Sequence, residues 1–376
     1  MNTYIVDTTL RDGEQAPGVV FGHKEKFEIA HFLDILGIEE VELGTPAMGK
    51  HEQRSIRDIA VAGFCFRTIS WCRAIKDDID LAASCKTDSV NISFPVSQIQ
   101  LNALGKNFDW VRNEIPKLVK YAHNSFNKVI VGLQDASRCE RKQLVEVVGI
   151  AVSSGADRIR IADTVGILTP LDVMSLFADL SYEFPCTDFE FHAHNDLGMA
   201  TANAFMALKY GAKGVSGTLN GLGERAGNMA IEELIMANYI KDKNLTKYNT
   251  NSINKACAYV ASASNRPLHQ GKPICGENAF AHETGVHVRS ILQDKLSYQP
   301  FDEKLVGVES NKIVIGKHSG KAALTHFFNQ KGVNPTCSQL KQLHEKIRDG
   351  ISLKGNIPTE QFVTNLFNDL NLSYGK

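Results

Sequence analysis

Residues 7–18 read Asp-Thr-Thr-Leu-Arg-Asp-Gly-Glu-Gln-Ala-Pro-Gly and follow directly on a short apolar segment, Tyr4-Ile5-Val6. The apolar segment predicts a buried strand, and Gly13, Pro17 and Gly18 predict a turn after it. Two aspartates, a glutamate and an arginine are more charge than a turn needs for solubility, with a plain polar loop as the alternative interpretation. A doubly wound sheet would usually carry a glycine-rich phosphate turn after its first strand. The stretch therefore favours another parallel architecture.

The rest of the chain alternates short apolar segments with longer amphipathic ones. Strands are predicted at 4–7, 39–43, 66–71, 89–94, 128–133, 157–162, 188–194 and 214–218. Helices are predicted at 24–36, 78–85, 109–123, 141–154, 171–182, 199–210 and 229–241. Such regular alternation over about 240 residues indicates an α/β fold of the (β/α)8 TIM-barrel type, with an open doubly wound sheet as the alternative. Polar clusters at strand ends favour the barrel, because barrel active sites form there.

The pattern changes near residue 265. Arg266-Pro267 and Lys272-Pro273 break the alternation, and helical patterns then return at 285–293, 321–330, 338–350 and 359–370. We predict a catalytic TIM barrel over residues 1–265 and a C-terminal helical lid or arm region over residues 266–376. The arm is too short to bury a large core by itself, and we expect no further regulatory domain of about 100 residues.

Composition limits the class of partner. The formal net charge of −1 argues against nucleic acid or an anionic membrane as a main partner. The first residues show no leader pattern, and no apolar run is long enough for a membrane span. Eight cysteines are scattered without a CxxC pair, which predicts free thiols in a reducing compartment. We expect a cytoplasmic protein.

A second polar cluster, His192-Ala193-His194-Asn195-Asp196, ends a predicted strand far along the chain. Because strand side chains alternate, His192 and His194 point to the same side, toward the barrel interior. We predict that they are metal ligands, with Asp12 as the third; two histidines in a polar strand end are the alternative. Two imidazoles and a carboxylate suit Mg²⁺, Mn²⁺ or Zn²⁺.

The following strand ends in a glycine-rich loop, residues 217–228, whose glycines let the backbone approach a ligand closely. Asn228 is predicted at the start of the next helix, where it either adds a carbonyl oxygen to the metal or caps the helix. Glu224 and Arg225 can simply pair with the barrel rim. Glu190, one step deeper than the histidines, is a candidate hydrogen-bond acceptor for one imidazole.

Together these motifs resemble the isopropylmalate and homocitrate synthase family of aldol-type acyltransferases. The matching stretches are DTTLRDGEQAPG at 7–18, HAHND at 192–196 and NGLGERAGN at 220–228, and the likeness extends over essentially the whole chain. ELGTPAMG at 42–49 and GKHSG at 316–320 are most similar to homocitrate synthases associated with nitrogen fixation. Related lyases usually carry a cysteine in the glycine loop, and this chain does not. The resemblance thus favours synthesis over cleavage.

The resemblance implies that a metal-dependent enzyme condenses acetyl-CoA with a 2-oxo acid, which is 2-oxoglutarate in homocitrate synthases. The acid would chelate the metal through its carboxylate and ketone oxygens, and Arg11 would neutralise the charge that develops on the ketone oxygen. Gln15, Glu42 and Thr164 match family positions that hold the oxo acid or shape its pocket. A general base would take a methyl proton from acetyl-CoA, and thioester hydrolysis would complete the reaction.

The family places that base on the arm, and there His287 matches best and His282 second. In the family the arm of one subunit reaches over the barrel of its partner, which implies a homodimer. Gln134 stands where the family usually carries a glutamate after the fifth strand. An amide cannot stabilise an imidazolium by charge, and the neighbouring Asp135 could replace it only if the strand end turned it inward.

The acceptor remains open at this stage. A related synthase would make citrate from oxaloacetate, citramalate from pyruvate, or 2-isopropylmalate, and one methylene in a pocket discriminates by only about 1–3 kcal/mol. A metal-stabilised scaffold or binding protein is the non-enzymatic alternative. It leaves the set of Arg11, Asp12, His192 and His194 without a purpose.

Overall fold

The computed structural model describes residues 3–241, 247–310, 312–354 and 359–374. Their contacts divide the chain into two compact units, Met1–Leu268 and His269–Lys376. Each unit buries apolar side chains of its own. Within the described ranges, no helix is both long and apolar enough to cross a membrane.

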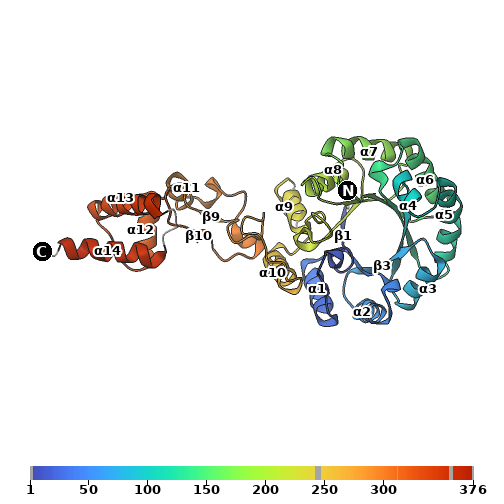
Figure 1. The fold of residues 1–376 in the computed structure, drawn as a ribbon, viewed down its shortest axis with the longest axis horizontal. Helices are drawn as coiled ribbons and strands as arrows, with labels where there is room; N and C mark the ends of the chain where they lie inside the picture. The colour runs from blue at the N-terminus through green and yellow to red at the C-terminus, as the bar shows by residue number, and fades with distance from the viewer. Residues whose placement is uncertain (1–2, 242–246, 311, 355–358, 375–376) are drawn as a thin grey trace. The chain divides into compact units, whose positions relative to one another are not determined.

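The first unit is a closed barrel of eight parallel strands, seen end-on in Figure 1. The strands are β1 (Tyr4–Asp7), β2 (Glu40–Gly44), β3 (Arg67–Arg73), β4 (Ser89–Pro95), β5 (Lys128–Gln134), β6 (Arg158–Asp163), β7 (Phe189–Ala193) and β8 (Gly214–Gly217). They follow one another in chain order, and β8 closes on β1 with Tyr4 opposite Gly214. The predicted TIM barrel is confirmed, and each predicted strand lies within two residues of its observed bounds.

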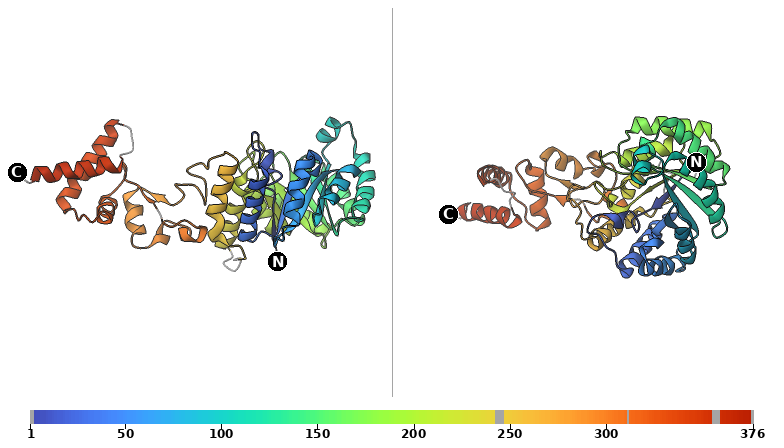
Figure 2. Two further views of the ribbon diagram at one scale, coloured as in Figure 1. Left: turned by 90° about the horizontal axis from the view of Figure 1, so that it is seen from below. Right: turned by 45° about the vertical axis from the view of Figure 1, so that its right-hand side comes forward.

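Helices surround the strands (Figure 1). They are α1 (His23–Leu36), α2 (Lys50–Ala60), α3 (Lys76–Ser84), α4 (Gln98–Ala103), α5 (Phe108–Ala122), α6 (Arg141–Ser153), α7 (Pro170–Glu183), α8 (Ala200–Lys209), α9 (Ile231–Lys241) and α10 (Ile253–Ala263). Helices α2, α4 and α10 were not predicted. The apolar pattern of α2 is weak, because its buried apolar side chains are only Ile56 and Ile59. The left view of Figure 2 shows α1 in blue beside α10 in yellow-orange, where the rings of Phe32 and Tyr259 lie 5.3 Å apart.

Outward-facing strand side chains form the apolar layer between strands and helices. Phe189 and Phe191 of β7 both meet the ring of Phe177 on α7 edge-on, at centroid distances of 6.4 and 5.3 Å. These positions alternate along β7 with Glu190 and His192, which point to the barrel interior. Period-two alternation therefore separates the packing face from the chemical face of the same strand.

Buried ion pairs fill the barrel interior. Arg158 of β6 is fully buried and contacts Glu40 of β2 (Nη1–Oε2 2.7 Å) and Glu190 of β7 (Nη1–Oε2 3.0 Å). Two residues along β6, Arg160 contacts Glu42 of β2 (2.6 Å) and again Glu190 (2.6 Å). Burial alone would raise the pKa of Glu40, but the hydrogen bonds and charge of Arg158 outweigh it and lower this pKa to about 2. Since a buried charge without its partner costs several kcal/mol, these pairs tie β2, β6 and β7 together.

In its described residues, the second unit has four α-helices and a two-stranded parallel sheet. Its elements are β9 (Ala281–His282), α11 (Gly285–Ile291), β10 (Lys312–Ile313), α12 (Lys321–Gln330), α13 (Cys337–Lys354) and α14 (Glu360–Tyr374). The four predicted helices of this region are present. They share a small apolar core that includes Val288 of α11, Phe328 of α12, Leu343 of α13 and Phe367 of α14.

Replacing Glu40 by glutamine tests the buried ion pairs. The pKa of Glu40 is about 2 in the fold against an ordinary value of 4.5, so its charge stabilises the fold above pH 4.5 and this contribution is lost as the pH falls from 4.5 to 2. Glu40→Gln should lower the free energy of unfolding by at least about 3 kcal/mol at pH 7, and the difference should shrink by about 2 kcal/mol at pH 3. Urea unfolding of both proteins measures it. A difference independent of pH would contradict the lowered pKa.

Candidate active site and metal centre

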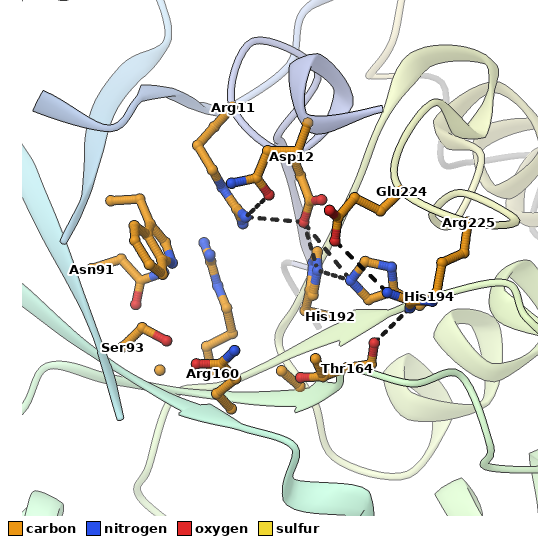
Figure 3. Close-up of a pocket in the computed structure, with 15 residues that line it drawn as sticks. Arg11, Asp12, Asn91, Ser93, Arg160, Thr164, His192, His194, Glu224 and Arg225 are labelled. Atoms are coloured by element: carbon orange, nitrogen blue, oxygen red, sulfur yellow. Dashed lines mark hydrogen bonds and ion pairs between the residues drawn. The ribbon is translucent and has the colours of Figure 1, made fainter. Parts of the chain in front are cut away.

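The carboxyl ends of the strands surround a cavity of about 410 Å³ (Figure 3). Nine of the residues singled out from the sequence line it together: Arg11, Asp12, Gln15, Gln134, Thr164, His192, His194, Glu224 and Arg225. The other lining residues are Trp71, Asn91, Ser93, Gly132, Arg160 and Ala162. Segments from the first to the last strand thus contribute to one site.

The turn after β1 presents Arg11 and Asp12 to the cavity. The backbone N–H groups of Arg11, Asp12 and Gly13 all donate to the carbonyl oxygen of Thr8, at 3.1, 2.8 and 3.1 Å. This single acceptor winds the chain into a tight turn. Two consecutive functional side chains consequently leave the strand end in a defined direction.

Glu14, which had no role assigned from the sequence, is structural. Its carboxylate accepts the N–H of Phe21 (2.9 Å) and pairs with the buried ammonium of Lys26 (2.6 Å). Lys26 belongs to α1, so Glu14 fixes the turn to the first helix.

Asp12, His192 and His194 converge on one point, as Figure 3 shows. His192 Nε2 lies 3.0 Å from Asp12 Oδ2, His194 Nε2 lies 3.9 Å from the same oxygen, and the two Nε2 atoms are 3.3 Å apart. Ligand atoms that share one small divalent cation at about 2.0–2.2 Å stand about 3–3.5 Å from each other. The spacing of the three groups, all buried, therefore fits a common cation.

The protonation of His194 and the hydrogen-bond contact of His192 suit a ligand role. Burial and, second to it, the neighbouring His192 lower the pKa of His194 to about 4. His194 is thus neutral at neutral pH, as a metal ligand must be. His192 places its Nδ1 3.0 Å from Ser216 Oγ on β8, a contact that leaves Nε2 for the cation.

Burial alone would raise the pKa of Asp12, but the charge of Arg11 and the hydrogen bond from His192 hold it well below its usual range. Asp12 therefore stays ionised. This carboxylate gives the donor set a negative charge, which a divalent cation would neutralise.

Asn228 is fixed beside His194 by the backbone. An antiparallel bridge pairs the two residues, and the N–H of Met229 donates to the carbonyl oxygen of Ala193 (3.0 Å). The amide nitrogen of Asn228 donates to the carbonyl of Leu222 (2.9 Å), while its Oδ1 is buried and has no hydrogen-bond partner among the described residues. Helix α9 begins only at Ile231, two residues later than predicted, so Asn228 does not cap it. The side-chain oxygen of Asn228 is therefore available as a fourth metal ligand.

Glu190 corrects one expectation. It does not accept a hydrogen bond from either imidazole, because its carboxylate pairs with Arg158 (3.0 Å) and Arg160 (2.6 Å) one layer deeper. The two buried guanidinium groups need this negative charge, and the hydroxyl of Ser216 serves His192 instead.

Arg11 is held by two carboxylates at the edge of the cavity. Its Nε donates to Glu42 Oε1 (2.6 Å) and its Nη1 lies 3.1 Å from Asp12 Oδ2. Glu42 itself is fully buried below the cavity and does not line it. Burial raises the pKa of Glu42, but Arg11 and Arg160 outweigh this effect and lower it to about 2. Glu42 accordingly positions the two arginine side chains. It lies too deep in the barrel to contact a substrate directly.

Gln134 lines the cavity at the end of β5, and the adjacent Asp135 turns away from it. Asp135 adopts a left-handed backbone (φ 60°), and its buried carboxylate is held by Arg138 (2.7 Å) and by the hydroxyl of Ser97. Its N–H donates to Thr164 Oγ1 (2.8 Å), which orients that hydroxyl. Asp135 therefore does not replace the missing glutamate.

Arg225 contacts two other segments of the barrel rim at once. Its guanidinium pairs with Asp196 (2.8 Å) and donates to the carbonyl oxygen of Thr164 (2.7 Å). The glycine-rich loop after β8 is thereby linked to the ends of β6 and β7. Glu224, the neighbouring residue, lines the cavity.

The two arm histidines lie in the second unit. The ring of His287 on α11 stacks on Tyr298 at 3.9 Å. His282 on β9 buries its Nε2, which has no hydrogen-bond partner among the described residues, and burial and His287 lower its pKa. The predicted GKHSG motif packs beside them, because the N–H of His318 donates to Glu283 Oε1 (3.0 Å).

Sequence reasoning missed Arg160, Ser216 and Trp71. A signal for Arg160 was present: Arg158 and Arg160 alternate with Ile159 and Ile161, which places both arginines on the inner face of a barrel strand. The sequence around Ser216 and Trp71 gives no such signal, because it does not show which distant residues their side chains will contact.

Residues 2–260 match the family described as HMGL-like, and residues 274–354 match the one described as "Homocitrate synthase post-HMGL domain-like". "2-Isopropylmalate synthase 2" of Caldanaerobacter subterraneus is 44% identical over 331 residues, covering 88% of this chain and 85% of the relative. The homocitrate synthase of Frankia alni is 41% identical over 327 residues, covering 87% and 93%. The solved HMG-CoA lyase of Brucella melitensis shares the fold (TM-score 0.62, 16% identity), covering 70% of this chain and 99% of that one.

The donor set generates a binding prediction. His192→Ala should weaken Mn²⁺ binding by more than about 100-fold, since even partners of metal ligands contribute 10–100-fold to affinity. Asn228→Ala should weaken it less, because an amide oxygen binds a transition-metal cation more weakly than an imidazole nitrogen does. Isothermal titration with Mn²⁺ measures both, and His23→Ala, which alters a histidine paired with Ser55 on the helical surface, is the control. Wild-type affinity in His192→Ala would refute the metal centre.

Proposed function

The chain belongs to the HMGL-like family and is an acyltransferase-type condensing enzyme, and we propose that it is a metal-dependent homocitrate synthase that condenses acetyl-CoA with 2-oxoglutarate. The observation that carries this proposal is the convergence of Asp12, His192 and His194 beside Arg11 in one cavity. The match of residues 274–354 to the post-HMGL domain of homocitrate synthases supports it.

We assign the cation to Asp12, His192, His194 and Asn228, with Mg²⁺, Mn²⁺ or Zn²⁺ as candidates. When bound, it would supply Lewis-acid polarisation of the ketone of the oxo acid. Its site lies within the cavity, so that the carboxylate and ketone oxygens of the acid can reach it.

Arg11 stabilises the charge that develops on the ketone oxygen. Its guanidinium is held by Glu42 and Asp12 before the substrate arrives, so little reorganisation is needed when the charge forms. Gln15 and Thr164 line the same cavity and orient the oxo acid. Thr164 can do so because its hydroxyl is already fixed by the Asp135 N–H.

We propose that the imidazole of His287, or else of His282, takes a methyl proton from acetyl-CoA. The resulting enolate carbon forms a bond to the ketone carbon of the acceptor, and the ketone oxygen takes up a proton. Water then cleaves the thioester, which releases the CoA thiol and leaves a new carboxylate. In this proposal the enzyme is a homodimer, and the arm (residues 266–376) of one subunit serves the barrel (residues 1–265) of the other.

A synthase with another acceptor is the second candidate, because "2-isopropylmalate synthase 2" of Caldanaerobacter subterraneus is also similar to this chain. A citramalate- or citrate-forming enzyme belongs to the same group. The cavity and its donor set serve any of these acids, which all share the 2-oxo carboxylate.

The release of free CoA tests the proposal. Acetyl-CoA with 2-oxoglutarate and Mn²⁺ should yield free thiol and homocitrate, and a chelator should stop the release because the donor set is then empty. A thiol reagent and mass spectrometry of the product measure this across a panel that includes oxaloacetate, pyruvate and branched 2-oxo acids. No release with any acid would refute the enzyme, and preference for another acid would refute the homocitrate assignment. His192→Ala should be inactive.

Gln134→Glu tests the departure from the family pattern. A carboxylate near the base would favour the imidazolium and raise the pKa of the base, so the acidic limb of kcat/KM should move upward by about one pH unit. Gln134→Met, similar in size but uncharged, should leave the limb in place. An identical pH profile for all three proteins would make residue 134 a bystander.

A further inference from the structure

We propose that Arg160 selects the acceptor by binding a second carboxylate at the far end of the 2-oxo acid. This role rests on the proposed condensation, and it identifies the residue that distinguishes dicarboxylic from monocarboxylic acceptors. Arg160 is a cationic residue that is neither a proposed metal ligand nor the proposed base.

Among the described residues, one nitrogen of the Arg160 guanidinium, Nη2, has neither a hydrogen bond nor an ion pair. Arg160 is 2% exposed, its Nη1 donates to Glu42 (2.6 Å), and its Nε pairs with Glu190 (2.6 Å). Its Nη2 is buried and has no hydrogen-bond partner among the described residues, although Arg160 lines the cavity. An unpaired buried donor is unfavourable, and a carboxylate is the strongest acceptor for a guanidinium.

The strand register places residues without long side chains next to this group. Arg160 of β6 stands opposite Gly132 of β5, which stands opposite Ser93 of β4, and all three line the cavity. A Cβ at residue 132 would lie 2.8 Å from the side-chain oxygen of Asn91, closer than side chains pack. Residue 132 must therefore be small, and the cavity wall next to Arg160 consists of this glycine and of Ser93.

The other cations of the cavity are already engaged. Arg225 pairs with Asp196 and the Thr164 carbonyl, and Arg11 is held by Asp12 and Glu42 next to the metal centre. Figure 3 shows Arg160 entering the cavity beside Arg11. An acid whose oxo and first carboxylate groups face the metal ligands can thus extend its far end toward Arg160.

Matched acceptors isolate the far carboxylate. 2-Oxoglutarate and 2-oxopentanoate have equal chain length and differ in a carboxylate against a methyl group, and oxaloacetate and 2-oxobutyrate form a shorter pair. The wild-type protein should favour the diacid of at least one pair by about 10²–10⁴-fold in kcat/KM, because the monoacid leaves Nη2 unpaired. Arg160→Met should abolish this preference, chiefly through KM for the diacid. Arg160→Lys should retain part of it.

Arg158→Lys is the control, because Arg158 also pairs with Glu190 but does not line the cavity. It should leave the diacid-to-monoacid ratio unchanged even if it lowers stability. Equal use of diacid and monoacid by the wild type would overturn the inference. So would an Arg160→Met protein, folded by circular dichroism, that loses activity with both acids in proportion, since Arg160 would then only position Glu42.

A binding measurement separates this inference from the proposed function. Glutarate carries both carboxylates but no ketone, so it cannot act as an acceptor. It should bind the wild-type protein in isothermal titration and bind Arg160→Met at least about tenfold more weakly. If no oxo acid is condensed but glutarate binding depends on Arg160, the reaction is wrong and the carboxylate site stands. Equal glutarate binding by both proteins overturns the site.

Discussion

The charge balance inside the barrel is the constraint on which the rest of the structure depends. Arginines on β6 and glutamates on β2 and β7 lie where a TIM barrel ordinarily packs apolar side chains. Each of these charges is tolerable only because an opposite charge is within hydrogen-bond reach. The strands must therefore close in the observed register, since a shift by one residue would turn the charges into the apolar layer.

The same balance prepares the cavity above it. Glu42 holds Arg11 and Arg160 with its two oxygens, so two cations reach the cavity from one buried carboxylate. Glu190 pairs with the arginines below and does not contact the imidazoles, so that His192 can contact Ser216 and the proposed cation. The donor set of the proposed metal centre is thus anionic, as a divalent cation requires, and the neighbouring wall is cationic. A bound cation and this wall would both attract the negative groups of a 2-oxo acid.

Much of this could be predicted from the sequence. The strand positions followed from apolar segments of strand length, and the grouping of Asp12 with His192 and His194 followed from their positions at strand ends, because all strands of a parallel barrel end at one face. Helix α2 could not be predicted, since its polar composition hides a narrow apolar stripe. The role of Glu190 was predicted wrongly. The alternation along its strand showed that it points inward, but it did not show that its partners would be the arginines of β6.

By itself the sequence determined the alternation of strands and helices, the residues that face inward and the family to which the chain belongs. These properties are local, because side-chain direction depends on strand periodicity alone. Only the tertiary structure decided which inward charges meet: that Glu42 lies beneath the cavity, that Asp135 turns away and that Arg160 keeps an unpaired nitrogen. Pairings between distant strands depend on register and closure, and neither is encoded in any one segment.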